Sequence, residues 1–178
     1  VRHCPLCCAA INDILPALAS LPWGGAGAVL ITACDNGIDI AITSPVPYFS
    51  SGFKTAVEKL PGVIRVTWNT RCVAQTVTPT VNFDGHVVEY PSGAFLQPTV
   101  PSEHALRDLV VTAAAGAKHV VDLFCGLGNF TYALNADGFD IAGVGVKRDL
   151  FLHPLTVGML KQYDCVVMDP PRAGAFAQ

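Results

Sequence analysis

Charged residues are scarce in this chain of 178 residues: they make up 14% of it, whereas hydrophobic residues make up 51%. This composition excludes an intrinsically disordered protein and predicts one or two globular domains with a buried core. Long apolar runs are also missing, since no stretch reaches the roughly 18 residues that a membrane-spanning helix needs. The N-terminal segment is polar and cysteine-rich, unlike a secretory signal, which is basic and then apolar. We therefore expect a cytoplasmic protein without a membrane partner.

Positive charge is not in excess either, because the net charge is −3 and the basic residues are scattered. Surfaces that bind phosphate usually leave a basic footprint, so the charge argues mildly against nucleic acid as a partner. An enzyme that acts on RNA can carry its basic surface on another domain. The charge therefore leaves the kind of partner open.

The seven cysteines are irregularly spaced. A chain with this much apolar material does not need a disulfide framework, and an odd number of cysteines does not suggest one. Four of them lie among apolar or small residues and are interpreted as buried thiols: Cys34, Cys72, Cys125 and Cys165. The other three are clustered near the N-terminus, at Cys4, Cys7 and Cys8.

The first 92 residues carry the pattern of an α+β region. Asp35-Asn36-Gly37 and Asp84-Gly85 predict hairpin turns, because Asn and Gly accept the positive φ that such turns require. We expect helices over residues 11–21, interrupted by Pro16, and 53–60, with strands over 28–34, 38–43, 63–68, 76–83 and 86–90.

Residues 93–178 alternate between helices and apolar strands, which predicts a parallel sheet and a Rossmann-like α/β domain. Ser102 is expected to cap a helix whose apolar face includes Leu109. We expect further helices from Asn129 and over 156–161, and strands over 119–124, 139–144 and 164–168.

This second domain is too short for its fold. Only a short helix fits between Gly128 and Phe139, whereas a strand–helix–strand unit takes about thirty residues. No strand is seen to end in the Asp or Glu that would hold ribose hydroxyls. We therefore expect an incomplete domain, with residues omitted near Tyr132–Ala133.

A glycine turn follows the apolar strand expected over residues 119–124. Asp122, Gly126 and Gly128 lie where glycine lets the backbone approach a ligand and where a helix N-terminus favours an electronegative group. An ordinary tight strand-to-helix turn explains these residues equally well. Asn129 follows Gly128, so the third glycine of the dinucleotide-binding pattern is absent, which argues against a dehydrogenase.

Asp169-Pro170-Pro171-Arg172 ends the last predicted strand. It places a carboxylate at the edge where open α/β sheets bind ligands, and the two prolines stiffen the turn that holds it. An ordinary turn accounts for one proline but less well for the whole tetrapeptide, so we favour a functional role for Asp169.

Four segments taken together resemble the RNA 5-methyluridine methyltransferase family, which uses S-adenosylmethionine to modify uridine in ribosomal and transfer RNA. They are Gly93–Thr99, Asp122–Thr131, Arg148–Phe151 and Met168–Ala175. The segment His3-Cys4-Pro5-Leu6, less specifically, is similar to the one that carries the family's last iron–sulfur cysteine.

The resemblance implies RNA as the partner of an enzyme that we expect to be monomeric. It also implies a [4Fe–4S] cluster with Cys4 as one ligand and the other ligands upstream of Val1; one cysteine alone cannot hold such a cluster. The residues expected to bind S-adenosylmethionine are Gln97, Asp122, Phe124, Gly126, Gly128, Asn129, Asp149 and Asp169.

The family's reaction requires a thiolate that adds to C6 of uracil, after which C5 takes the methyl group and a base removes its proton. The resemblance implies a nucleophilic Cys in a Ser-Cys-Asn-Pro turn and a Glu base, both expected after Gln178. Cys125 and Cys165 are interpreted as packing thiols, so we expect no catalytic residue within the chain and no activity from it alone. Two alternatives stay open: a methyltransferase acting on an exocyclic nitrogen at the Asp-Pro-Pro corner, and a non-catalytic module that binds RNA or cofactor.

Overall fold

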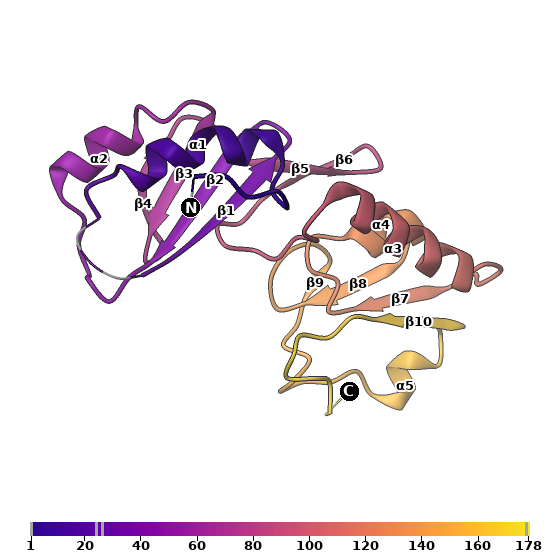
Figure 1. The fold of residues 1–178 in the computed structure, drawn as a ribbon. Coiled ribbons are helices and arrows are strands. Elements are labelled where there is room, and N and C mark those ends of the chain that lie inside the picture. Colours follow the sequence, from indigo (N-terminus) through magenta and orange to yellow (C-terminus); the bar gives the residue numbers. More distant parts are fainter. Residues whose placement is uncertain (1, 24, 26, 177) are drawn as a thin grey trace. The chain divides into compact units, whose positions relative to one another are not determined.

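The structure is a computed structural model that describes residues 2–23, 25, 27–176 and 178. The chain divides into two compact units, which are described separately (Figure 1). The first unit runs up to Asn82 and includes Val87–Ala94, and the second consists of Phe83–His86 and Phe95–Gln178. The domain boundary expected between residues 92 and 93 stays a prediction.

The first unit contains a mixed sheet in the order β1-β2-β3-β4. Its strands are β1 (Ala28–Cys34), β2 (Gly37–Thr43), β3 (Val63–Trp68) and β4 (Arg71–Gln75). The hairpin predicted at Asp35-Asn36-Gly37 joins β1 and β2 antiparallel. Strand β2 pairs parallel with β3 through a crossover that contains α2 (Ser51–Val57). The pairing of β3 with β4 is antiparallel.

Strand β4 was not expected from the sequence, which predicted one strand over 76–83. The turn before β4 uses Asn69 and Thr70, with φ of 49° and 69°, and contains no glycine. Both residues are in the left-handed conformation that tight hairpins favour, which threonine rarely adopts. The usual hairpin pattern is therefore missing from the sequence at this turn.

Helix α1 (Ala9–Ala19) and helix α2 contribute buried side chains to the core of the first unit. Helix α1 continues through Pro16, where an interruption was expected. The buried residues of this core are Ile14, Leu18, Leu21, Ile38, Ile40, Ile42, Phe53, Val57, Leu60, Val66, Trp68 and Val73. A hairpin of β5 (Thr80–Phe83) and β6 (His86–Glu89) follows, with Asp84 and Gly85 at its tip, as predicted.

A buried ion pair joins β2 to β3. Asp39 is 1% exposed, and the Arg65 Nε donates to its Oδ1 at 2.5 Å. The Arg65 Nη2 also donates to the Tyr90 carbonyl oxygen at 2.8 Å. Asp39 Oδ2 has no hydrogen-bond partner. Among the described residues, the charge of Arg65 is therefore what offsets the cost of burying the Asp39 carboxylate.

The second unit is a parallel sheet in the order β10-β7-β8-β9, which confirms the expected α/β class. The strands are β7 (Val120–Leu123), β8 (Asp137–Asp140), β9 (Val146–Lys147) and β10 (Cys165–Met168). The helices are α3 (Val100–Ala113), α4 (Asn129–Leu134) and α5 (Val157–Leu160), and α4 contacts both α3 and β7. None of the helices in the described part of the chain has the length and apolar character of a membrane span.

Helix α3 differs from its prediction at both its start and its apolar face. Thr99, not Ser102, is the N-cap: its Oγ1 accepts from the Ser102 backbone N–H at 3.2 Å. Leu109, expected on the buried face, is 68% exposed, and α3 has no buried residue. The helix contacts the short α4, and Leu106 and Val110 of the expected apolar face are half-buried.

The second unit contains an unusually short connection between two parallel strands. Helix α4 runs without a break through Tyr132–Ala133, where an omission was predicted. Residues 141–145 alone, in contrast, join β8 to β9, although these strands are parallel. Parallel neighbours ordinarily need a crossover of a dozen or more residues. The connection between β8 and β9 is therefore unusually short, and the omission expected near Tyr132–Ala133 stays a prediction.

Replacement of Arg65 by alanine tests the buried ion pair. Removing one partner leaves Asp39 buried without its charge partner, so the free energy of unfolding should fall by about 3–5 kcal/mol. Urea unfolding followed by tryptophan fluorescence measures this for the first unit, to which both tryptophans belong. The matched control is Lys54→Ala, which breaks an exposed pair with Glu58 (N–O distance 3.9 Å) and should cost about 0.5 kcal/mol or less. Equal effects of the two changes would contradict this account.

Candidate functional site

The carboxyl ends of three adjacent parallel strands bring together residues that are far apart in the sequence. β7 pairs on one side with β10, Leu123 opposite Met168, and on the other side with β8, Leu123 opposite Phe139. The glycine turn after β7 and Asp169 after β10 therefore lie at the same edge of the sheet. This is the edge at which open α/β sheets bind ligands.

The turn after β7 has an unusual backbone. Phe124, Gly126 and Gly128 all have positive φ, at 63°, 52° and 94°. A Cβ at Gly128 would lie 2.7 Å from both the Tyr132 ring and the Val144 side chain, so only glycine fits there. A Cβ at Gly126 would meet nothing within 4 Å, so the turn is open on that side. Phe124 adopts this conformation although it has a side chain, which is a sign of local strain.

Asp122 is buried at the end of β7 with only one of its oxygens satisfied. The Thr131 hydroxyl donates to Asp122 Oδ2 at 2.6 Å, while Asp122 Oδ1 has no partner. Asn129 Oδ1, at the start of α4, is a second buried acceptor without a partner. Buried acceptors that lack donors are costly and rare in folded proteins. The two orphaned oxygens fit a ligand that brings its own hydrogen-bond donors.

The electrostatics of the strand edge act on Asp122 as well. Burial raises its pKa to about 6; the hydrogen bond from Thr131 opposes this rise, and the negative charges of Asp169 and Asp140 add to it. Asp122 is therefore poised to change charge near neutral pH, a property common at functional sites.

Asp140 is a candidate site residue that the sequence interpretation missed. It ends β8 beside the glycine turn, where its Oδ2 accepts from the Gly126 N–H at 3.0 Å and its Oδ1 from the Ala142 N–H at 2.9 Å. The predicted strand covered 139–144, which placed Asp140 inside it. Once β8 is seen to end at Asp140, this residue is the strand-end carboxylate that appeared to be absent. Thr131 was also missed as the partner of Asp122.

The segment after Asp140 lies against the glycine turn. The Val144 N–H donates to the Gly126 carbonyl oxygen at 3.0 Å, and the Cys125 thiol donates to the Val144 carbonyl oxygen at 3.3 Å. A ligand that approaches Gly128 from this side meets Val144. The short link between β8 and β9 thus closes part of the candidate site.

The remaining predicted cofactor residues are less closely connected to the turn. Asp149 follows β9, and its Oδ1 accepts from the backbone N–H groups of Phe151 and Leu152 at 2.9 and 3.1 Å, so it stabilises its own turn. Gln97 is half-buried before α3, and none of the interactions found among the described residues joins it to the glycine turn. Asp169 is exposed, and its connection to the site is electrostatic, through Asp122.

The N-terminal cysteines make local contacts. The Cys4 backbone N–H donates to Asn12 Oδ1 at 2.7 Å, and hydrogen bonds from the Leu6 backbone and the Cys7 thiol lower the pKa of Cys4. Over the described residues, no group of three or more His, Cys, Asp or Glu side chains is arranged to hold a metal ion. These residues do not fit an iron–sulfur cluster by themselves, and Cys4 as a ligand stays a prediction.

Comparison with known proteins found no matching family model. The chain is 35% identical to an uncharacterized RNA methyltransferase of Rhizobium meliloti, over 96% of the chain and 46% of that protein. It is 26% identical to the 23S rRNA (uracil(1939)-C(5))-methyltransferase of Aeromonas hydrophila, over 57% of the chain and 29% of that protein. The structure matches that of the Pyrococcus abyssi tRNA (uracil-54, C5)-methyltransferase with a TM-score of 0.62 and 13% identity, covering 98% of this chain and 54% of that one. This structural match shows a shared fold.

The Rhizobium alignment is longer than this chain. It extends over 196 residues, more than the 178 in this chain, so the relative carries at least 18 residues without a counterpart here. The chain spans about half the length of this relative. The chain belongs to the family of proteins named RNA methyltransferases.

Proposed function

We propose that this chain is the cofactor-binding part of an enzyme that transfers a methyl group from S-adenosylmethionine to C5 of uridine in RNA. The names of the relatives support RNA as the substrate, and those of the Aeromonas relative and the Pyrococcus neighbour support uracil C5. The Pyrococcus structure is a complex with S-adenosyl-L-homocysteine, which supports a cofactor of this kind.

The observation that carries the proposal is the pair of buried, unpartnered oxygens at the glycine turn, Asp122 Oδ1 and Asn129 Oδ1. S-adenosylmethionine has an amino group and ribose hydroxyls, which can supply the missing donors. The turn beside Gly126 is open to such a ligand. We propose that Asp122 accepts from the amino group and that Asp140, at the end of the adjacent strand, faces the ribose.

When bound, the cofactor supplies an electrophilic methyl group. In this proposal the chain's own residues orient it: Phe124 and the glycines shape the turn, and Asp169 at the neighbouring strand end faces the reacting groups. The rigid Pro170-Pro171 corner fixes the direction of the Asp169 carboxylate. Asp149 and Gln97 remain proposed contacts to the more distant parts of the cofactor.

The nucleophile is proposed to come from outside residues 1–178. Cys125 lies at the glycine turn, but burial, with the charges of Asp122 and Asp140, raises the pKa of its thiol to about 12. A thiol with that pKa is almost entirely protonated at neutral pH, and the thiolate is the reactive form. Cys125 therefore suits a packing role.

One observation favours a second candidate, a non-catalytic RNA-binding module. Val144 packs against Gly128, and the turn's Gly126 backbone groups are hydrogen-bonded to Asp140 and Val144. A cofactor that approaches the turn from the side of Gly128 must displace this segment. If this segment is not displaced, the chain has the fold of a methyltransferase but does not bind the cofactor.

Substitution of Gly126 tests the cofactor site. Gly126→Val places a branched side chain at a φ of 52°, which strains the turn and fills its open side, so affinity for S-adenosylhomocysteine should fall at least about tenfold. Isothermal titration calorimetry measures this. Gly116→Val is the control, because Gly116 also has a positive φ (93°) and open space but precedes β7 at the other edge of the sheet. Equal affinities of the wild type and the Gly126 variant for S-adenosylhomocysteine would refute the cofactor site. If neither protein binds this ligand, the result would favour the non-catalytic RNA-binding module.

The pKa of Asp122 predicts a pH dependence of binding. A raised pKa means that Asp122 is ionised only above about pH 6, so attraction to the cofactor's ammonium group should weaken as pH falls below 6, by up to about tenfold per unit. Calorimetry between pH 5 and 7 measures the slope. Asp122→Asn keeps an acceptor but does not titrate, so its affinity should be lower and flat over this range. The Asp122→Asn variant should be at least as stable as the wild type at pH 7. A carboxyl group with a raised pKa favours the folded state only while it is protonated, and that contribution is lost as pH rises through about 6. A wild-type affinity that does not change with pH would contradict the role of Asp122.

The proposed origin of the nucleophile predicts that residues 1–178 alone do not methylate RNA. Transfer of a radiolabelled methyl group to uridine-containing RNA should stay at background, because the described cysteine nearest the turn is protonated. Activity that disappears in Cys125→Ala would overturn this assignment and make Cys125 the nucleophile.

A further inference from the structure

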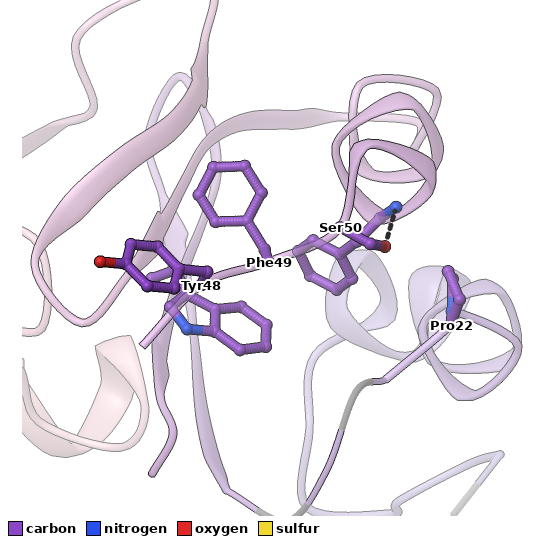
Figure 2. A pocket seen from close by; sticks show the side chains of 6 residues that line it. Pro22, Tyr48, Phe49 and Ser50 are labelled. Carbon is purple, nitrogen blue, oxygen red and sulfur yellow. Dashed lines mark hydrogen bonds between the residues drawn. The ribbon is translucent and has the colours of Figure 1, made fainter. Parts of the chain in front are cut away.

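The first unit contains an aromatic pocket that the proposed cofactor site does not use. It has a volume of about 140 Å³ and is lined by Pro22, Tyr48, Phe49, Ser50, Phe53 and Trp68. Figure 2 shows the aromatic rings gathered beside the Tyr48–Ser50 stretch, with Pro22 across from them. The volume is well below the roughly 300 Å³ at which pockets for drug-sized ligands begin, so it suits a single planar ring.

The floor of the pocket belongs to the core. Phe53 and Trp68 are 1% and 3% exposed and meet edge to face, with ring centroids 5.1 Å apart. Phe49 packs against both, at 6.4 and 6.2 Å. The floor is therefore rigid and apolar.

The rim is different, because its side chains are exposed. Tyr48 is 71% exposed, so its ring stabilises the core little. The Ser50 Oγ caps α2 by accepting from the Phe53 N–H at 3.1 Å, and its hydroxyl proton remains able to donate to a ligand. An apolar floor with exposed polar groups at its edge can hold an aromatic ring that carries carbonyl oxygens.

The loop that presents Tyr48 is tied down on its N-terminal side. The Trp68 Nε1 donates to the Val46 carbonyl oxygen at 2.8 Å, and the Asn69 side chain bonds both the N–H and the carbonyl oxygen of Ser44 at 2.8 Å. Pro45 and Pro47 restrict the same loop. An exposed aromatic ring held on a restrained loop costs little ordering entropy when it binds a ligand.

A positive charge lies over one face of the exposed Tyr48 ring, which leaves the other face for a ligand. The guanidinium carbon of Arg71, at the start of β4, lies 5.9 Å from the centroid of the Tyr48 ring. None of the ion pairs found among the described residues includes Arg71. Its charge is thus available to an anion next to the pocket.

We propose that this pocket binds one unpaired base of the RNA substrate, with Tyr48 stacking on the base and Arg71 contacting the adjacent phosphate. Unpaired RNA bases are recognised by stacking on aromatic and arginine side chains, and phosphates by nearby cations. The pocket supplies an exposed ring, a cation over one face of that ring and room for one base. The choice of RNA as the ligand rests on the proposed function.

The test measures binding of a fluorescein-labelled oligouridylate to the chain by fluorescence anisotropy, without cofactor. Tyr48→Ala removes the stacking surface and should weaken binding by about tenfold, while Tyr48→Phe should retain it. Arg71→Gln should weaken binding and reduce the slope of log affinity against log salt by about one. Lys59→Gln, which removes an exposed cation from the same unit, is the control and should change affinity far less.

Cross-linking supplies a second readout that a structural role would not produce. Ultraviolet irradiation of the complex should attach uridine to the peptide that contains Tyr48 and Phe49. Wild-type affinity in Tyr48→Ala with unchanged tryptophan fluorescence, or failure of the wild type to bind the RNA, would overturn the proposal. If the wild type binds the RNA through Tyr48 but does not bind S-adenosylhomocysteine, the proposed function is refuted while the base-binding pocket stands.

Discussion

The parallel pairing of β7 with β8 and β10 is the constraint on which the candidate site depends. It aligns the carboxyl ends of three strands, so that Asp122, Asp140 and Asp169 converge although they are widely separated in the chain. Three carboxylates at one edge repel each other, and the rise in the pKa of Asp122 reflects that repulsion in addition to burial. A fold that had only to be stable would not gather them.

The same edge shows a conflict between packing and binding. The buried oxygens of Asp122 and Asn129 that lack hydrogen-bond donors favour binding of a ligand. The short link from β8 to β9, in contrast, packs Val144 against Gly128 and covers that side of the turn. A full crossover would carry its helix away from the turn, but five residues cannot do so. The length of this connection therefore decides how far the turn is accessible, more than the chemistry of the turn itself.

In the first unit, the residues that stabilise the fold differ from the exposed residues proposed to bind a ligand. Its sheet is held by apolar side chains and by the Asp39–Arg65 pair, both shielded from water. Tyr48 and Arg71 lie at the surface near the buried rings of Phe53 and Trp68. A surface of this kind can change its ligand without a change of fold.

Local patterns in the sequence determined much of this protein. The hairpin at Asn36-Gly37, the strand before Asp122, the glycine turn and the α/β class all follow from turn chemistry and periodicity, which act over a few residues. The missed features have a different cause. Strand β4 follows a turn without glycine, and Leu109 on α3 stays exposed. Asp140 became recognisable only when the pairing of β8 with β7 set where its strand ends. Whether Asp122 is satisfied, and what lies over Gly128, depends on contacts between distant segments, so only the tertiary structure decided them.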